Sequence, residues 1–198
     1  MRIALPAEVR TPRLVLRRWR QSDAAVLKAV LDANLAHLQA WLPWAMSEPS
    51  PIEVLEERLG LFAQQFDAGE EWLFAIWSGS AGRLLGGAGL HLRIGEGGLE
   101  MGYWLQADAT GKGFMTEAAD ALTRLALQQP GIERVQIRCD PENVASAAVP
   151  RRLGYRHLRT IPNATVKPSG AARDSMVWEI TRGEIESINR QPPAITNG

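Results

Sequence analysis

The chain has 198 residues, of which 45% are hydrophobic and 22% charged, and its 22 basic residues balance its 22 acidic ones. Such balance offers no broad attraction for nucleic acid or an anionic membrane, so we expect no DNA partner. The single cysteine, Cys139, excludes an intrachain disulfide and multi-cysteine metal sites. No stretch approaches the roughly 20 apolar residues of a membrane helix, and the first residues lack a signal-peptide core, so we expect a cytoplasmic protein.

The first third of the chain predicts a strand followed by helices. Strand-forming residues fill the segment 14–19. Apolar residues then recur with the helical period over 23–42, where Pro43 closes the segment. The same period over 52–66 predicts another helix, with Gly69 available as its C-cap.

The middle of the chain changes to short apolar runs separated by Gly and Ser, which predict consecutive antiparallel strands over 72–77, 84–92 and 99–105. Further along, the pattern predicts a helix over 114–129, a strand over 135–140, a short helix over 143–153, and strands over 155–161 and 175–181. We expect a single α/β (α+β) domain over residues 1–183 and a flexible tail over 184–198.

The most informative segment is a glycine-bearing turn between a predicted strand and a predicted helix. The start of a helix presents unpaired N–H groups, and glycines let the backbone approach a phosphate closely. The candidate pyrophosphate site comprises Gly111, Gly113 and the amides of Lys112, Phe114 and Met115. The spacing is not that of a Walker loop, and the third glycine of a dinucleotide fingerprint is absent. A plain strand-to-helix turn is the alternative.

Five motifs in order resemble the GNAT N-acetyltransferases, and within them the RimJ/RimL branch of ribosomal-protein N-terminal acetyltransferases. They are TPRLVLRRWRQSDA near the start, WLPW at 41–44, EMGYWL at 100–105, GKGFMTEA at 111–118 and DPENVASAAVPRRLGY at 140–155. The resemblance implies a mixed, strongly twisted, mostly antiparallel sheet with flanking helices. It also implies that the family's fourth and fifth strands splay apart to admit the pantetheine arm of acetyl-CoA.

The resemblance assigns the turn to the diphosphate of acetyl-CoA. The family's loop has Arg or Gln, two free positions, Gly, one free position, then Gly or Ala; here those places are taken by Thr110, Gly111, Lys112, Gly113, Phe114 and Met115. The two ends depart from the pattern, but backbone amides provide most of such a site. The backbones of Tyr103 and Leu105 would bind pantetheine. Asn143 would touch pantetheine as well, or serve only as a helix N-cap.

The resemblance also suggests residues for the reaction. Glu100 is the first candidate for the base that takes the proton of the amine, and His91 on the neighbouring strand is the second; each has a purely structural alternative. Ser146 would donate a proton to the departing thiolate, or would only be a small helical residue. Other branches carry a tyrosine acid where this chain has Pro150, and this proline predicts a bent or locally open helix beside the sulfur site.

The resulting hypothesis is an acetyl-CoA-dependent N-acetyltransferase in which a primary amine attacks directly within a ternary complex. The acceptor is a protein N-terminus or a small amine such as an antibiotic, toxin or polyamine. A non-catalytic acyl-CoA-binding sensor and an α/β domain that binds no CoA remain alternatives. We expect no metal, a monomer or homodimer, and core positions rather than pocket positions for the WLPW segment.

Overall fold

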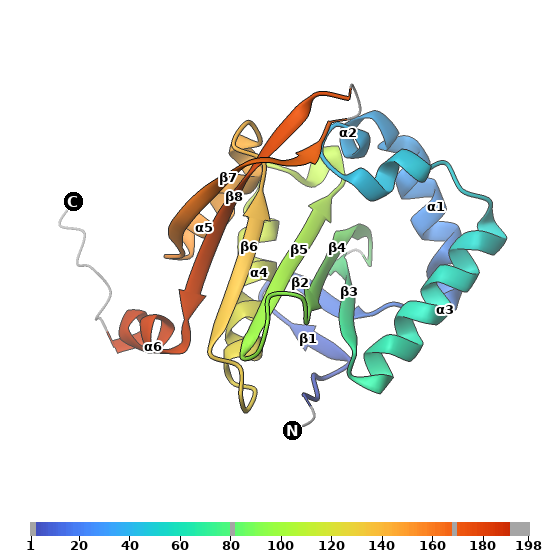
Figure 1. Ribbon diagram of the computed structural model, residues 1–198. Coiled ribbons are helices and arrows are strands. Elements are labelled where there is room, and N and C mark those ends of the chain that lie inside the picture. Colours follow the sequence, from blue (N-terminus) through green and yellow to red (C-terminus); the bar gives the residue numbers. More distant parts are fainter. Residues whose placement is uncertain (1–2, 80–81, 168–169, 191–198) are drawn as a thin grey trace, which may run out of the picture.

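The computed structural model describes residues 3–79, 82–167 and 170–190. One sheet has eight strands in the order β1-β2-β3-β4-β5-β6-β8-β7 (Figure 1). The strands are β1 (Glu8–Arg10), β2 (Leu14–Arg18), β3 (Glu71–Ser78), β4 (Leu84–His91), β5 (Gly98–Leu105), β6 (Arg134–Cys139), β7 (Arg156–Val166) and β8 (Ala172–Thr181). Only β5 and β6 pair in parallel. The mixed, mostly antiparallel fold expected from the resemblance is confirmed.

Helices cover both faces of the sheet (Figure 1). They are α1 (Ala24–Ala33), α2 (Leu35–Gln39), α3 (Ile52–Ala68), α4 (Phe114–Leu127), α5 (Val144–Arg152) and α6 (Arg182–Arg190), with short 3-10 turns η1 (Gln21–Asp23), η2 (Pro43–Ser47) and η3 (Ala107–Ala109). Alternate residues of a strand face opposite sides. In β3, Phe74 and Ile76 therefore join the core under α4, while Ala75 joins the core under α1 and α3.

The expectation of one continuous helix over 23–42 was wrong, because the chain breaks at Asn34. The Asn34 amide donates to the Val30 carbonyl at 2.8 Å, and its side-chain oxygen accepts from the backbone N–H of Ala107 at 2.8 Å. Asparagine competes in this way with regular helical hydrogen bonding. The break separates α1 from α2 and connects the helical side of the molecule to the end of β5.

The parallel pair β5 and β6 diverges along its length. Its ladder runs from Gly98–Arg134 to Met101–Ile137 and stops there, although β5 continues to Leu105 and β6 to Cys139. The separated ends leave an opening between two central strands, as the resemblance implied. Because α4 starts soon after β5 and α5 soon after β6, both helices begin near this opening.

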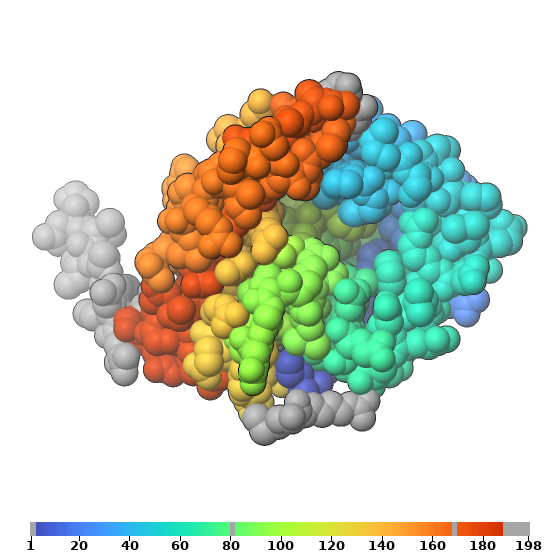
Figure 2. Space-filling model, in the orientation of Figure 1, coloured from blue at the N-terminus to red at the C-terminus, as the bar shows by residue number. Residues whose placement is uncertain are grey.

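The C-terminal part differs from expectation in two ways. The hairpin of β7 and β8 is longer than predicted and reaches the end of α2, where Arg173 donates to the carbonyls of Trp41 and Ala40 at 2.8 and 2.7 Å. Figure 2 shows a hollow beneath this contact. Residues 184–190, the first part of the expected tail, belong to α6, where Glu184 accepts hydrogen bonds from Thr181 and Ile185 is buried. Residues 191–198 lie outside the described part.

Within the described ranges, no helix is long and apolar enough to cross a membrane. The same residues contain no cluster of three or more His, Cys, Asp or Glu side chains that could hold a metal ion.

Candidate active site

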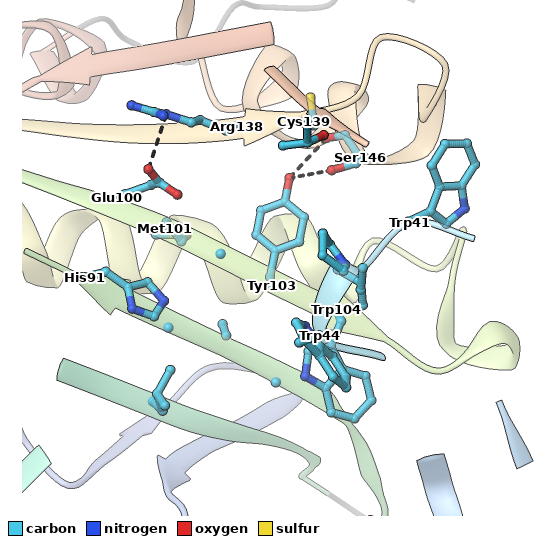
Figure 3. A pocket seen from close by; sticks show the side chains of 18 of the residues that line it. Trp41, Trp44, His91, Glu100, Met101, Tyr103, Trp104, Arg138, Cys139 and Ser146 are labelled. Atoms are coloured by element: carbon cyan, nitrogen blue, oxygen red, sulfur yellow. Dashed lines mark hydrogen bonds and ion pairs between the residues drawn. The ribbon is translucent and has the colours of Figure 1, made fainter. Parts of the chain in front are cut away.

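A cavity of about 920 Å³ lies between the α1–α3 side of the molecule and the β7–β8 hairpin. Figure 3 shows part of its lining. Sequence-predicted residues that line it are His91, Glu100, Tyr103, Asn143 and Ser146. Leu105 and the turn from Thr110 to Met115 do not line it. The candidates for the reaction are thus brought together, whereas the candidate phosphate turn forms a separate surface.

His91 is paired with an acidic residue that the sequence reasoning missed. Its Nδ1 lies 3.0 Å from Oε1 of Glu71, which occupies the register position opposite His91 on β3. With the proton on Nδ1 donated to this carboxylate, Nε2 is left as a proton acceptor. A methyl group added at Gly102 would meet Nε2 at 3.8 Å, so this nitrogen faces the glycine on β5 inside the cavity.

Glu100 stands beside His91 as its register partner on β5, but its carboxylate is already engaged. Arg93 donates to Oε1 from Nε and Nη2 at 3.0 and 2.6 Å, and Nε of Arg138 lies 3.2 Å from Oε2. The glutamate side chain is buried between these two guanidinium groups. Accepting a proton from a substrate would neutralise the carboxylate that pairs with both arginines.

The beginning of α5 faces the same cavity. Asn143 is the N-cap of α5, and its Oδ1 accepts from the Ser146 backbone N–H at 3.0 Å. The Tyr103 hydroxyl donates to the Ser146 carbonyl at 3.1 Å, and the Ser146 hydroxyl donates to Tyr103 at 3.4 Å. Burial raises the pKa of Tyr103 well above its ordinary value, and burial also raises the pKa of the nearby Cys139 thiol. Both groups therefore stay protonated at neutral pH.

Pro150 lies inside α5, which nevertheless runs without interruption from Val144 to Arg152. A proline has no N–H, so the Ser146 carbonyl lacks its usual helical partner. The helix is thus continuous through the position where the sequence predicted a bend or a local opening, and the Tyr103 hydroxyl donates to the Ser146 carbonyl in place of the missing N–H.

The floor of the cavity is made of glycines on β4 and β5, namely Gly87, Gly89 and Gly102. A Cβ at Gly87 would come within 2.8 Å of Nε1 of Trp104, and one at Gly89 within 2.4 Å of Cδ2 of Leu73. A side chain at either position would displace its neighbours, so these glycines keep the strand backbone accessible from the cavity.

The WLPW segment lines the cavity, which corrects the expectation that it would belong to the core. Trp44 is 40% exposed and packs edge-on against Trp104 at a centroid distance of 6.0 Å. Trp41 is half-buried beneath the guanidinium of Arg173, which is also ion-paired with Asp140 at 2.9 Å. Figure 3 shows Trp41, Trp44 and Trp104 at one end of the cavity. The Arg173 contacts connect Trp41 at this end to the β7–β8 hairpin.

The glycine turn leads directly into α4. Gly111 and Gly113 have positive φ values of 73° and 77°, a conformation that favours glycine. Nothing lies within 4 Å of a Cβ placed on Gly111. The first N–H groups of a helix lack internal acceptors, and Gly113 is the N-cap of α4. The exposed turn therefore fits a diphosphate that is bound by backbone amides.

The turn is held in shape by a neighbouring arginine that the sequence reasoning also missed. Arg13 donates to the Lys112 carbonyl at 2.9 Å and stacks over Phe114 at 4.8 Å. Glu117 accepts from Thr11 Oγ1 at 2.6 Å, from the Arg13 backbone N–H at 2.9 Å and from Arg13 Nε at 2.6 Å. A link from the segment before β2 to α4 thus supports the turn.

Local sequence patterns could not have found Glu71, Arg93, Arg138 or Arg13 as partners, because each meets its partner only in the folded chain: the first three through the packed strands and their loops, and Arg13 through the turn and α4. Strand pairing was the one available signal: it places Glu71 opposite His91 once β3 and β4 form a hairpin.

Comparisons with known proteins agree with this fold. A family model for the acetyltransferase (GNAT) domain matches residues 13–156. The "Probable N-acetyltransferase YjcK" of Bacillus subtilis (strain 168) is 29% identical over 138 residues, which are 68% of this chain and 75% of YjcK.

Two solved structures share the fold. The microcin C7 self-immunity acetyltransferase MccE, in complex with acetyl-CoA and AMP, has a TM-score of 0.81 at 18% identity and covers 89% of this chain and 97% of its own. RimL, a ribosomal L7/L12 α-N-protein acetyltransferase solved with coenzyme A, has a TM-score of 0.78 at 24% identity, covering 90% and 97%. Since the family model spans most of the chain, this protein belongs to the GNAT acetyltransferase family, whose acetyl donor is acetyl-CoA.

Proposed function

We propose that this protein transfers an acetyl group from acetyl-CoA to a primary amine, which attacks directly within a ternary complex. One observation carries the proposal: a single cavity holds the His91–Glu71 pair and also reaches Asn143 and Ser146, where β5 and β6 diverge. A base for the amine and a hydroxyl for the departing sulfur thus face one space. Such an arrangement suits acyl transfer between two bound substrates.

Backbone groups would hold the acetyl donor, acetyl-CoA. The amides of residues 111–115 suit the diphosphate, and the unpaired ends of β5 and β6 suit pantetheine, with Tyr103, Leu105 and Asn143 beside it. The two departures from the family's loop have structural explanations: the Thr110 hydroxyl donates to the Ala107 carbonyl at 2.7 Å, and Met115 is buried in the core. Neither departure removes an amide. Bound acetyl-CoA supplies the acetyl group as a reactive thioester.

His91 is the base that the geometry favours over Glu100. Its Nε2 faces the cavity while Glu71 holds Nδ1, an arrangement that fixes the ring and stabilises the charged imidazolium once a proton has been accepted. Both oxygens of Glu100 are engaged by arginines instead. We therefore assign Glu100 to ordering Arg93 and Arg138 beside the acceptor, and we assign proton removal to His91.

The cavity best suits an acceptor amine of low basicity. Deprotonating an α-amine with a pKa near 8 costs about 1.4 kcal/mol at pH 7, whereas a lysine amine near 10.4 costs about 4.6 kcal/mol. A single imidazole base therefore suits the α-amine better than the lysine amine. The two solved structures with this fold represent two classes of acceptor, since RimL is named for a protein α-amine and MccE for immunity to microcin C7. A cavity of about 920 Å³ has room for either a terminal residue or a small molecule.

The test is coenzyme A release from acetyl-CoA against a panel of N-terminal peptides and small amines, with the acetylated product identified by mass spectrometry. Calorimetric titration with acetyl-CoA runs beside it. Turnover that falls in His91→Gln, with acetyl-CoA affinity unchanged, would support the proposal. Tight binding with no turnover on any acceptor would instead favour the acyl-CoA sensor, and absence of binding would reject both.

A further inference from the structure

The proline inside α5 creates an unusual acceptor at the cavity. In an unbroken helix, the carbonyl of Ser146 would accept the N–H of residue 150. Pro150 has no N–H, so this carbonyl is open. Pro150 is buried within a continuous helix, and α5 continues past it to Arg152. Ser146 is partly buried at the wall of the cavity, where its open carbonyl is available to a donor from another side chain.

The donor comes from across the opening between the two central strands. The Tyr103 hydroxyl lies 3.1 Å from the Ser146 carbonyl oxygen and 3.4 Å from the Ser146 hydroxyl oxygen (Figure 3). Tyr103 belongs to the end of β5 that no longer pairs with β6. Its side chain therefore joins β5 to α5 at the level where the backbone ladder has ended.

We propose that Tyr103 is a positioning residue for the Ser146 hydroxyl, and that Pro150 gives it this role by leaving the Ser146 carbonyl open. This inference rests on the proposed acetyl transfer. Tyr103 donates its own proton to the carbonyl, so its oxygen accepts from the Ser146 hydroxyl and holds that group at the cavity wall. Burial keeps the phenol protonated, which preserves this donation.

The proton balance assigns separate tasks to the residues. As the amine nitrogen bonds to the acetyl carbon and the carbon–sulfur bond breaks, His91 takes one proton from the nitrogen. Ser146 gives its one hydroxyl proton to the sulfur, for which the O–H turns away from the Tyr103 oxygen. Exchange with water at the cavity returns both side chains to their starting states, and Tyr103 neither gains nor loses a proton.

The main test compares Tyr103→Phe, Ser146→Ala and the double variant in the coenzyme A release assay. Tyr103→Phe should lower kcat about 10- to 100-fold, as expected from misplacing a reacting group, while KM for acetyl-CoA stays within about twofold. In the Ser146→Ala background, the same change should lower kcat less than about twofold, because the group that Tyr103 positions is gone. If the two substitutions lower kcat in the double variant by the product of their separate factors, the inference is overturned.

A second test restores the helical N–H. In Pro150→Ala, the new N–H competes with Tyr103 for the Ser146 carbonyl, so kcat should fall although the helix gains a hydrogen bond. Gly60→Ala is the matched control, because it also improves a helix, has nothing within 4 Å of its new methyl and does not line the cavity. A folded Pro150→Ala variant with wild-type kcat would overturn the inference; if it fails to fold, the Tyr103→Phe comparison decides.

A readout without turnover separates this inference from the proposed function. The chain has two tyrosines, so labelling the tyrosine Cζ carbon yields two NMR signals, which Tyr103→Phe assigns. The Tyr103 signal should shift in Pro150→Ala and remain in place in Gly60→Ala. A Tyr103 signal that does not shift in Pro150→Ala would refute the proposed role of the hydrogen bond from Tyr103 to the Ser146 carbonyl. If the wild type turns over but Tyr103→Phe matches its kcat, the inference alone fails; if the wild type acetylates nothing, the inference falls with the proposed function.

Discussion

Replacing Glu117 by Gln should loosen the glycine turn and weaken acetyl-CoA binding, although Glu117 lies outside the cavity. Its carboxylate accepts three hydrogen bonds from Thr11 and Arg13, and Arg13 in turn donates to the Lys112 carbonyl within the turn. A glutamine keeps one acceptor oxygen but places an NH₂ group against the Arg13 Nε–H, so one bond is replaced by two opposed donors.

The size of the effect follows from exposure. The Glu117 side chain is 16% exposed, but that of Arg13 is 48% exposed, so their ion pair contributes at most about 1 kcal/mol. The charge-assisted bonds from the Thr11 hydroxyl and the Arg13 backbone lose strength, which adds about 1 kcal/mol. We expect the free energy of unfolding to fall by about 2 kcal/mol, and the Kd for acetyl-CoA to rise about fivefold as the turn loosens.

The pH dependence has a definite sign. Burial alone raises the pKa of Glu117, but the hydrogen bonds from Thr11 and Arg13 outweigh it and hold this pKa below its ordinary value of 4.5. A carboxylate whose pKa is lowered by folding stabilises the protein above the unfolded value, and this contribution is lost as the pH falls through the folded value. The difference in the free energy of unfolding between the wild type and Glu117→Gln should therefore be largest near neutral pH. It should shrink progressively as the pH falls below 4.5.

Urea unfolding across this pH range measures the stability term, and calorimetry with acetyl-CoA measures the binding term. Glu133→Gln serves as the control, because Glu133 is 64% exposed and 3.4 Å from Arg182, so its loss should cost little. The reasoning would be refuted by a Glu117→Gln variant that unfolds like the control, or whose stability deficit does not change between about pH 7 and pH 3.

Three further predictions concern the cavity and its support. Glu71→Gln should lower kcat/KM about tenfold by weakening the hold on the His91 ring, which steady-state kinetics of coenzyme A release would show. Gly102→Ala adds a methyl group 3.8 Å from Nε2 of His91, so turnover of bulky amines should fall more than that of small amines in a competition assay. Glu48→Ala should cost about 2 kcal/mol in urea unfolding, because Arg58 and the Ser50 backbone N–H both lose the buried carboxylate that accepts from them.

Elements with clear periodicity could be predicted from the sequence, and those defined by tertiary contacts could not. The strands β3, β4 and β5 lie within a residue of the predicted ranges, since each is a compact apolar run between glycine or serine turns. The strand β1 was missed because it has three residues, two of them exposed. The strands β7 and β8 extend beyond prediction because their added residues are mostly exposed and carry little apolar pattern.

The candidate site was predictable residue by residue but not in its pairings. The cavity brings together His91, Glu100 and Ser146, which the sequence proposed as candidates. The choice between the two candidate bases depends on Glu71, Arg93 and Arg138, whose positions follow from strand register and side-chain direction. Likewise, the open carbonyl could be foreseen from a proline in a helix. Its partner could not, because Tyr103 is 43 residues away from Ser146 along the chain.

The most direct test of acetyl transfer in this cavity is to measure coenzyme A release and acetylated product together, for the wild type and His91→Gln, across the acceptor panel. We predict that the wild type acetylates an amine with low basicity and that His91→Gln slows this reaction about 10²- to 10⁴-fold with unchanged affinity for acetyl-CoA. A His91→Gln variant as fast as the wild type, or a wild type that binds acetyl-CoA and acetylates no amine, would contradict it.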